Sequence, residues 1–310
     1  MKIAVIGPGS MGLLYGGKLS AAADTILVGN NPDHIREIQE NGVTIERNGE
    51  SKTYPVPAVL NGEHNEPVDL IILFTKAYLT EEALNQNRGL IGPDTCLLTL
   101  QNGKGHEDQL SAFADLSHIL IGTTAQGSSR KNAHHIINSG LGDTVIGILD
   151  PQSADEARKN RLEEIRSVFE AAGFPCTLSD NIAFTVWNKL MINASSSVLS
   201  GILQKPQGYV VQNEWAWLIC QDLIKEICEA AEGEGCQFDY DAQVERIRTH
   251  LEHAPDGFTS IYADIKNGRN TEVDTISGSV VHAAKKAGVS APTHEFVVNM
   301  VHALEGRPKA

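Results

Sequence analysis

Short apolar runs alternate with stretches of helical periodicity through the first 179 residues. Continuous apolar runs of this length are typical of parallel strands that are buried on both faces. The runs 43–45 and 53–59 have polar edges, which favours a hairpin. The predicted strands are 3–6, 25–29, 43–45, 53–59, 68–74, 95–100, 119–123, 133–137, 144–148 and 176–178, of which 119–123, 133–137 and 144–148 are expected to extend the sheet. The stretches between them predict helices at 13–23, 33–40, 81–89 and 155–172.

The pattern changes after Ser179, because no further strand pattern follows and long helical segments take over. Gly and Pro residues separate these segments, as expected for helix ends. They lie at about 180–202, 212–234, 239–252, 258–268, 274–288 and 292–305. We therefore predict an α/β fold, with a Rossmann-like dinucleotide-binding domain at 1–179 and an all-helical substrate and catalytic domain at 180–310. The active site is expected in a cleft between the two domains.

Composition narrows the function classes. The 310 residues carry a formal net charge of −14, which argues against nucleic acid or an anionic membrane as the main partner. No run of 18 apolar residues and no signal-peptide pattern occurs, so a cytoplasmic protein is expected. The five cysteines form no C-x-x-C pair, and no histidine stands at metal-site spacing from them. We therefore expect free thiols and no metal site. We expect His134 and His135 to be ordinary strand residues.

The segment Gly7-Pro8-Gly9-Ser10-Met11-Gly12 follows the first strand directly and opens the first helix. It fits the pattern G-x-G-x-x-G, in which each glycine has a physical reason. Gly7 permits the tight turn, Gly9 lets a pyrophosphate approach the backbone, and Gly12 lets the helix pack on the strand. The helix N-terminus would supply N–H groups to the phosphates. These residues predict a dinucleotide site.

The end of the second strand normally separates NAD from NADP. An acidic residue there binds the ribose 2′-hydroxyl, and an arginine accepts the 2′-phosphate. This chain has the neutral residues Asn30 and Asn31. His34 and Arg36 follow and are within reach of a 2′-phosphate, although a solvated helix face explains them as well.

Lys76 and Asn102 each follow the carboxyl end of a predicted parallel strand. Carboxyl ends of parallel strands lie on the edge of the sheet where ligands bind. We therefore expect both side chains on the same edge as the glycine-rich loop.

A lysine interrupts an apolar helical stretch in the second domain. Lys189, Asn193 and Ser197 have i, i+4, i+8 spacing, which puts them on one helix face. A lysine in such a place needs a partner or a use, and its pKa is easily shifted toward acid–base work. Glu272, before a later helix, is a candidate partner, although it also suits the first turn of that helix. A snorkelling lysine is the structural alternative.

Five segments in this order resemble the ketopantoate reductase (2-dehydropantoate 2-reductase) family along nearly the whole chain. They are GPGSMG, FTKAY, LQNGKG, WNKLMINAS and GRNTEVDTISG. The resemblance implies NADPH-dependent reduction of 2-dehydropantoate to D-pantoate, a step of pantothenate biosynthesis. It implies Lys189 as the proton donor and Glu272 as its support, with Asn193 and Ser260 binding substrate. Lys76 and Asn102 would line the cofactor and substrate site, with Asn102 contacting both.

Two positions differ from the family pattern. The family commonly has arginine where this chain has Asn30, and asparagine where it has Ser197. NAD therefore stays open as the cofactor, and Ser197 is expected to reshape the substrate pocket. The alternatives are an NAD-dependent D-2-hydroxyacid dehydrogenase acting on another small 2-oxo acid and a non-catalytic nucleotide sensor. A homodimer through the helical domain is also open.

Overall fold

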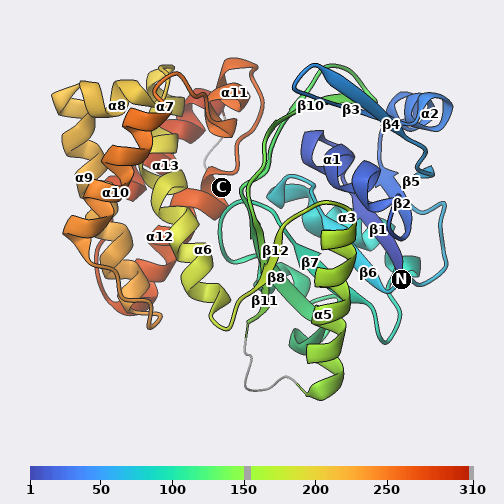
Figure 1. Cartoon of the computed structure of the whole chain (residues 1–310). Coiled ribbons are helices and arrows are strands. Elements are labelled where there is room, and N and C mark those ends of the chain that lie inside the picture. The colour runs from blue at the N-terminus through green and yellow to red at the C-terminus, as the bar shows by residue number, and fades with distance from the viewer. Residues whose placement is uncertain (150–154, 307–310) are drawn as a thin grey trace. The chain divides into compact units, whose positions relative to one another are not determined.

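The computed structural model describes residues 1–149 and 155–306 and divides into two compact units (Figure 1). The first unit contains residues 1–101 and 106–185, and the second contains residues 102–105 and 186–310. The domain boundary predicted from sequence, 179/180, therefore lies slightly before the division between the units. The sequence prediction also assigned 102–105 to the first domain, whereas this segment packs with the helices of the second unit.

The first unit is built on an eight-stranded sheet in the order β12-β11-β8-β7-β6-β1-β2-β5. From β5 to β8 all neighbouring strands are parallel, whereas β11 is antiparallel to β8. The order β5-β2-β1-β6-β7-β8 corresponds to the 3-2-1-4-5-6 order of dinucleotide-binding folds. The strands are β1 (Lys2–Ile6), β2 (Asp24–Gly29), β5 (Ala58–Leu60), β6 (Leu70–Leu73), β7 (Cys96–Thr99), β8 (Ile119–Thr124), β11 (Thr144–Ile148) and β12 (Cys176–Leu178).

A second, four-stranded sheet has the order β4-β3-β10-β9. A hairpin is present as β3 (Val43–Arg47) and β4 (Glu50–Tyr54), which pair antiparallel. The predicted second strand 53–59 is wrong in its bounds, because it divides between the end of β4 and β5 of the main sheet. The prediction that 133–137 extends the main sheet is wrong, because β10 (His135–Gly140) pairs with β3 and with β9 (Gly127–Arg130). The polar strand β9 was not predicted, since it has no apolar run.

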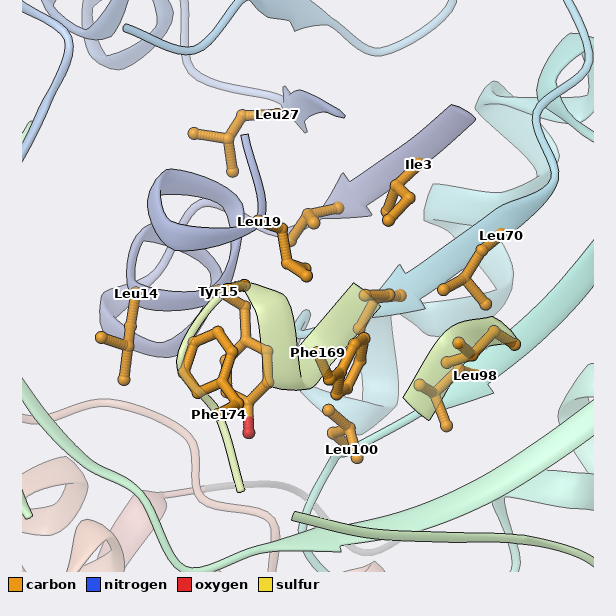
Figure 2. Packing of buried hydrophobic residues seen from close by; sticks show 14 of the residues in the cluster. Ile3, Leu14, Tyr15, Leu19, Leu27, Leu70, Leu98, Leu100, Phe169 and Phe174 are labelled. Atoms are coloured by element: carbon orange, nitrogen blue, oxygen red, sulfur yellow. The ribbon is translucent and has the colours of Figure 1, made fainter. Parts of the chain in front are cut away.

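Helices α1 and α5 share one hydrophobic core with the main sheet. Figure 2 shows the rings of Tyr15, Phe169 and Phe174 gathered beside Leu70 and Leu98 of the sheet. Tyr15 stacks on Phe174 with ring centroids 4.1 Å apart, and its hydroxyl bonds the side chains of two buried threonines. The helices of this unit are α1 (Ser10–Leu19), α2 (Pro32–Asn41), α3 (Thr80–Gln86), α4 (His106–Leu110) and α5 (Glu156–Ala171).

The second unit is helical, as predicted, and its long helices begin and end close to the expected residues. The predicted single helix over 180–202 is instead α6, a π-helical turn at Asn193–Ser197, and α7. The helices are α6 (Ile182–Ile192), α7 (Val198–Leu203), α8 (Gly208–Gln212), α9 (Glu214–Glu232), α10 (Tyr240–His253), α11 (Ser260–Lys266), α12 (Val273–Ala287) and α13 (Pro292–Glu305). In residues 1–149 and 155–306, no helix is long and apolar enough to cross a membrane.

A buried carboxylate joins two helices of this unit. Glu226 of α9 accepts hydrogen bonds from the backbone N–H groups of Thr293 and His294, at 2.8 and 2.9 Å. These N–H groups belong to the first turn of α13, where no carbonyl within the helix is available to them. Glu226 therefore caps α13 from a neighbouring helix and fixes the two elements together.

The Tyr15 hydroxyl gives a test of the core in the first unit. Its oxygen lies 2.8 Å from Thr124 Oγ1 and 2.6 Å from Thr144 Oγ1, all of them buried. Tyr15→Phe keeps the ring and leaves these hydroxyls without their shared partner, so we expect a loss of about 1–3 kcal/mol in the free energy of unfolding. Urea denaturation measures it, with Tyr54→Phe on β4 as the control, for which less than about 0.5 kcal/mol is expected. An equal effect of the two substitutions would contradict this account of the core.

Candidate active site

The glycine-rich loop joins β1 to α1 and depends on two of its glycines. Gly7 has φ +97°, and a Cβ there would lie 2.6 Å from the backbone nitrogen of Thr75. A Cβ on Gly12 would collide with the carbonyl oxygen of Gly7. A side chain at either position would therefore push the loop away from β6 or the helix away from the strand, as the sequence motif predicts.

Gly9, the middle glycine of the motif, leaves room for a ligand. A Cβ built on Gly9 would meet no atom within 4 Å, and Gly9 is the N-cap of α1 without a side-chain cap hydrogen bond. The first N–H groups of a helix have no acceptor within the helix, and the helix dipole there favours an anion. The loop residues Gly9, Ser10, Met11 and Gly12 therefore fit the pyrophosphate of a dinucleotide.

The loop lies where the strand order of the main sheet reverses. β1 pairs with β2 on one side and with β6 on the other, and Gly7 lies against the backbone of Phe74 and Thr75 after β6. Ligands of such sheets bind at this switch point, outside the carboxyl ends of the strands. Lys76 comes next in the chain and is half-buried, which is consistent with the predicted place for a cofactor-binding lysine.

Gln101 links the ends of β6 and β7. Its Nε2 donates to the carbonyl oxygen of Thr75 at 2.8 Å and to Thr80 Oγ1 at 2.9 Å. Gln101 was not predicted as a site residue, because a glutamine after a strand is not by itself a sign of catalysis or ligand binding. Its role here is to join the residues that directly precede Lys76 and Asn102.

The end of β2 carries Asn30, which is exposed, and Asn31, which caps α2. Asn31 Oδ1 accepts from the N–H of His34 at 3.1 Å, so its side chain already has a structural role. Arg36 donates to Asp33 on the same helix at 2.7 Å. Sequence reasoning missed Arg130, at the end of β9, which donates to the carbonyl oxygen of Pro8 in the glycine-rich loop. Nothing in the sequence around this arginine, which lies in an exposed polar strand, indicates that it contacts the glycine-rich loop.

Lys189 and Glu272 come together within the helical unit. Both are half-buried, and the two charges interact. Removal of the ammonium from water lowers the pKa of Lys189 to about 8, and the negative charge of Glu272 opposes this shift. Glu272 stands at the N-cap of α12 without a side-chain cap hydrogen bond, so helix capping does not account for its carboxylate. Lys189 can therefore give or take a proton near neutral pH.

A π-helical turn begins four residues after Lys189, at Asn193, and ends at Ser197. One extra residue in a turn rotates the following side chains, so Ser197 does not continue the regular i, i+4, i+8 stripe expected from the sequence. The buried Ser197 lies instead beside the 258–260 segment, where Thr259 Oγ1 donates to its carbonyl oxygen at 3.2 Å. Ser260 follows as the exposed first residue of α11.

The segment 102–104 is held by α12 and by Glu234, all within the second unit. Thr275 Oγ1, in the first turn of α12, donates to the carbonyl oxygen of Asn102 at 3.2 Å, and the N–H of Lys104 donates to the carbonyl of Thr275 at 2.8 Å. Lys104 Nζ bonds Glu234 at 2.8 Å, and Glu234 also accepts from Trp187 Nε1 at 3.0 Å. Trp187 precedes Lys189 by two positions in α6 and Thr275 follows Glu272 by three in α12. Hydrogen bonds thus connect the segment that carries Asn102 to α6, which carries Lys189, and to α12, which follows Glu272.

The described ranges contain no group of side chains that could bind a metal ion. There, no three His, Cys, Asp or Glu side chains are grouped so as to hold an ion. His134 lies 3.2 Å from Glu37, and His135, the first residue of β10, lies 3.4 Å from Glu46. The five cysteines are free thiols.

Comparison with known proteins agrees with this geometry. The family model "Ketopantoate reductase PanE/ApbA" matches residues 3–151, and its C-terminal counterpart matches residues 181–305. A 2-dehydropantoate 2-reductase of Pyrococcus horikoshii is 30% identical over 307 residues, with 98% of each chain covered. One of Lactococcus lactis is 30% identical over 321 residues, with 100% of each chain covered.

Solved structures with the same fold include enzymes of two names. A D-mandelate dehydrogenase with NADH and anilino(oxo)acetate is 29% identical, with a TM-score of 0.91 and 99% of each chain covered. A PanE/ApbA family ketopantoate reductase from Ralstonia eutropha is 26% identical, with a TM-score of 0.88 and 99% of each chain covered. This chain belongs to the ketopantoate reductase family and is an NAD(P)-dependent oxidoreductase acting on a CH–OH group.

Proposed function

We propose that this enzyme reduces 2-dehydropantoate to D-pantoate with NADPH. The observation that carries the proposal is the pair of Lys189 and Glu272, in which burial brings the lysine pKa to about 8. Reduction of a ketone needs a hydride for carbon and a proton for oxygen. A lysine with this pKa is well suited to deliver the proton near neutral pH.

The cofactor would be held by the glycine-rich loop of the first unit. Gly7, Gly9, Ser10, Met11 and Gly12 would bind its pyrophosphate, and Asn30 and Lys76 would contact the rest. A bound nicotinamide cofactor supplies the hydride that reduces the carbonyl carbon of the substrate.

Lys189 would donate its ammonium proton to the substrate oxygen as the C=O bond becomes a C–OH group. Before transfer, the same ammonium would stabilise the negative charge that develops on this oxygen. Glu272 would keep the ammonium protonated and oriented, since its charge favours the charged form of Lys189. The neutral amine left after the reaction regains a proton from solvent.

Substrate recognition would fall to polar groups around Lys189. Asn102, Asn193, Ser197 and Ser260 offer amide and hydroxyl groups for a carboxylate and a hydroxyl of a small 2-oxo acid. The widened turn at Asn193–Ser197 is typical of functional sites in helices, because it frees backbone groups and re-aims side chains.

A second candidate is an NADH-dependent D-2-hydroxyacid dehydrogenase acting on a bulkier 2-oxo acid. Two observations favour it: Ser197 and Asn30 depart from the family pattern, and the D-mandelate dehydrogenase of similar fold has NADH bound. A shorter side chain at 197 would leave more room for the substrate side chain.

Turnover with defined substrates distinguishes the two. NADPH and NADH oxidation are followed at 340 nm, a wavelength at which reduced nicotinamide absorbs, with 2-dehydropantoate, phenylglyoxylate and branched 2-oxo acids. The proposal requires the highest kcat/KM for 2-dehydropantoate with NADPH. A preference for NADH with phenylglyoxylate or a branched acid would establish the second candidate, and no turnover with any of them would favour a nucleotide sensor.

Replacement of Lys189 tests the proton donor. We expect Lys189→Ala to lower kcat by at least about a hundredfold, because one general acid typically contributes ~10²–10⁴-fold. The dissociation constant of NADPH, measured by fluorescence titration, should change little. Lys225→Ala, at an exposed position of α9, is the matched control and should retain wild-type kcat. Near-wild-type turnover of Lys189→Ala would remove Lys189 from the reaction.

The pH dependence of kcat/KM tests the pairing of Lys189 with Glu272. Reduction needs the protonated amine, so kcat/KM for reduction should fall by about tenfold per pH unit above the lysine pKa of about 8. Oxidation of the product needs the neutral amine and should rise through the same pH. Glu272 raises the pKa of Lys189, so Glu272→Gln should move both midpoints to lower pH. If Glu272→Gln changed thermal stability and left the midpoints in place, its carboxylate would have a structural role alone.

A further inference from the structure

Strand β9 is attached to the glycine-rich loop at two points. Ser128 Oγ donates to the carbonyl oxygen of Ser10 at 3.0 Å, and the guanidinium of Arg130 donates to the carbonyl oxygen of Pro8. Both strand and loop belong to the first unit. The Arg130 head group is therefore fixed at the loop that fits the pyrophosphate, although the strand that carries it belongs to the second sheet.

A chain of contacts places this guanidinium at the end of β2. A Cβ on Gly29 would lie 2.7 Å from Pro8 Cγ, so Pro8 packs directly on the last residue of β2. Arg130 Nη2 also lies 3.5 Å from His34 Nδ1 in the first turns of α2. Arg130 thus reaches the same corner as Asn30, where dinucleotide-binding folds recognise the adenosine ribose.

The local charges favour an anion at this corner. Two acidic side chains of α2 each have a basic neighbour: Asp33 accepts from Arg36 at 2.7 Å, and Glu37 lies 3.2 Å from His134 Nδ1. Burial and the charge of Arg130 lower the pKa of His34, and Glu37 opposes this shift. An anion beside Arg130 and His34 would relieve the repulsion between the two basic groups.

We propose that Arg130, assisted by His34, binds the 2′-phosphate of NADP in place of the arginine that is absent at position 30. This inference rests on the proposed NADPH-dependent function. A guanidinium has five N–H donors in a planar fork, so it can hold Pro8 and contact a phosphate at the same time. The absence of an acidic residue at Asn30 and Asn31 removes the group that would repel this phosphate.

Calorimetric titration with nucleotide fragments tests this assignment without any substrate. Adenosine 2′,5′-bisphosphate carries the 2′-phosphate, and 5′-AMP lacks it. We expect wild-type protein to bind the bisphosphate at least about tenfold more tightly than 5′-AMP, as for charge-assisted hydrogen bonds. Arg130→Met should remove most of this difference and leave the affinity for 5′-AMP within about twofold. His34→Ala should reduce the difference by less.

The control is Arg88→Met, which removes an exposed arginine that lies outside α2 and β9 and donates to the side chain of Asn85. It should leave both affinities unchanged. Equal losses for the bisphosphate and 5′-AMP in Arg130→Met would mean that Arg130 only holds the loop, and equal wild-type affinities would mean that the corner does not recognise a 2′-phosphate. Either result would overturn the proposal. Because the titrations contain no 2-oxo acid, failure of the proposed reaction would leave their outcome unaffected.

Discussion

The proposed chemistry of this protein depends on one lysine that is partly removed from water. Desolvation alone would drive Lys189 toward its neutral form, and the carboxylate of Glu272 limits that shift. The balance brings its pKa from 10.5 to about 8, where both protonation states are accessible near neutral pH. Neither effect would suffice by itself: a solvated lysine holds its proton too firmly for efficient transfer, and a buried lysine without a counter-charge would lie further toward its neutral form, which has no proton to donate.

The helical unit is arranged to keep this pair in place. Lys189 comes from α6, whose following turn widens at Asn193, and Glu272 comes from the start of α12. Thr275 of α12 and the Lys104–Glu234–Trp187 cluster fix the segment that carries Asn102. Rigid positioning of this kind is what acid–base groups require, since small displacements reduce proton transfer strongly. The first unit carries the glycine-rich loop proposed to bind the nucleotide, in which Gly7 and Gly12 cannot be replaced without moving β6 or α1.

Local pattern and chemistry predicted the glycine-rich turn between β1 and α1, the parallel strands and the long helices of the second unit. These features follow from apolar periodicity and from glycine stereochemistry, which a single sequence carries. The π-helical turn after Lys189 escaped prediction because one additional residue in a helix hardly alters the apolar pattern. The segment 102–105 belongs to the helical unit through the long-range ion pair of Lys104 and Glu234. The position of Arg130 depends on a second sheet that is assembled from strands far apart in the sequence. Contacts of this kind have no local signature.

The most direct test of the account is the ionisation of Lys189 itself. The 13Cε resonance of this lysine, assigned from its absence in Lys189→Arg, reports the pKa of the ammonium during a pH titration. The account predicts a midpoint at about 8, well below the ordinary lysine value of 10.5. A midpoint for Lys189 at the ordinary value would contradict it, because the amine would then be a solvated surface charge and no longer a tuned proton donor.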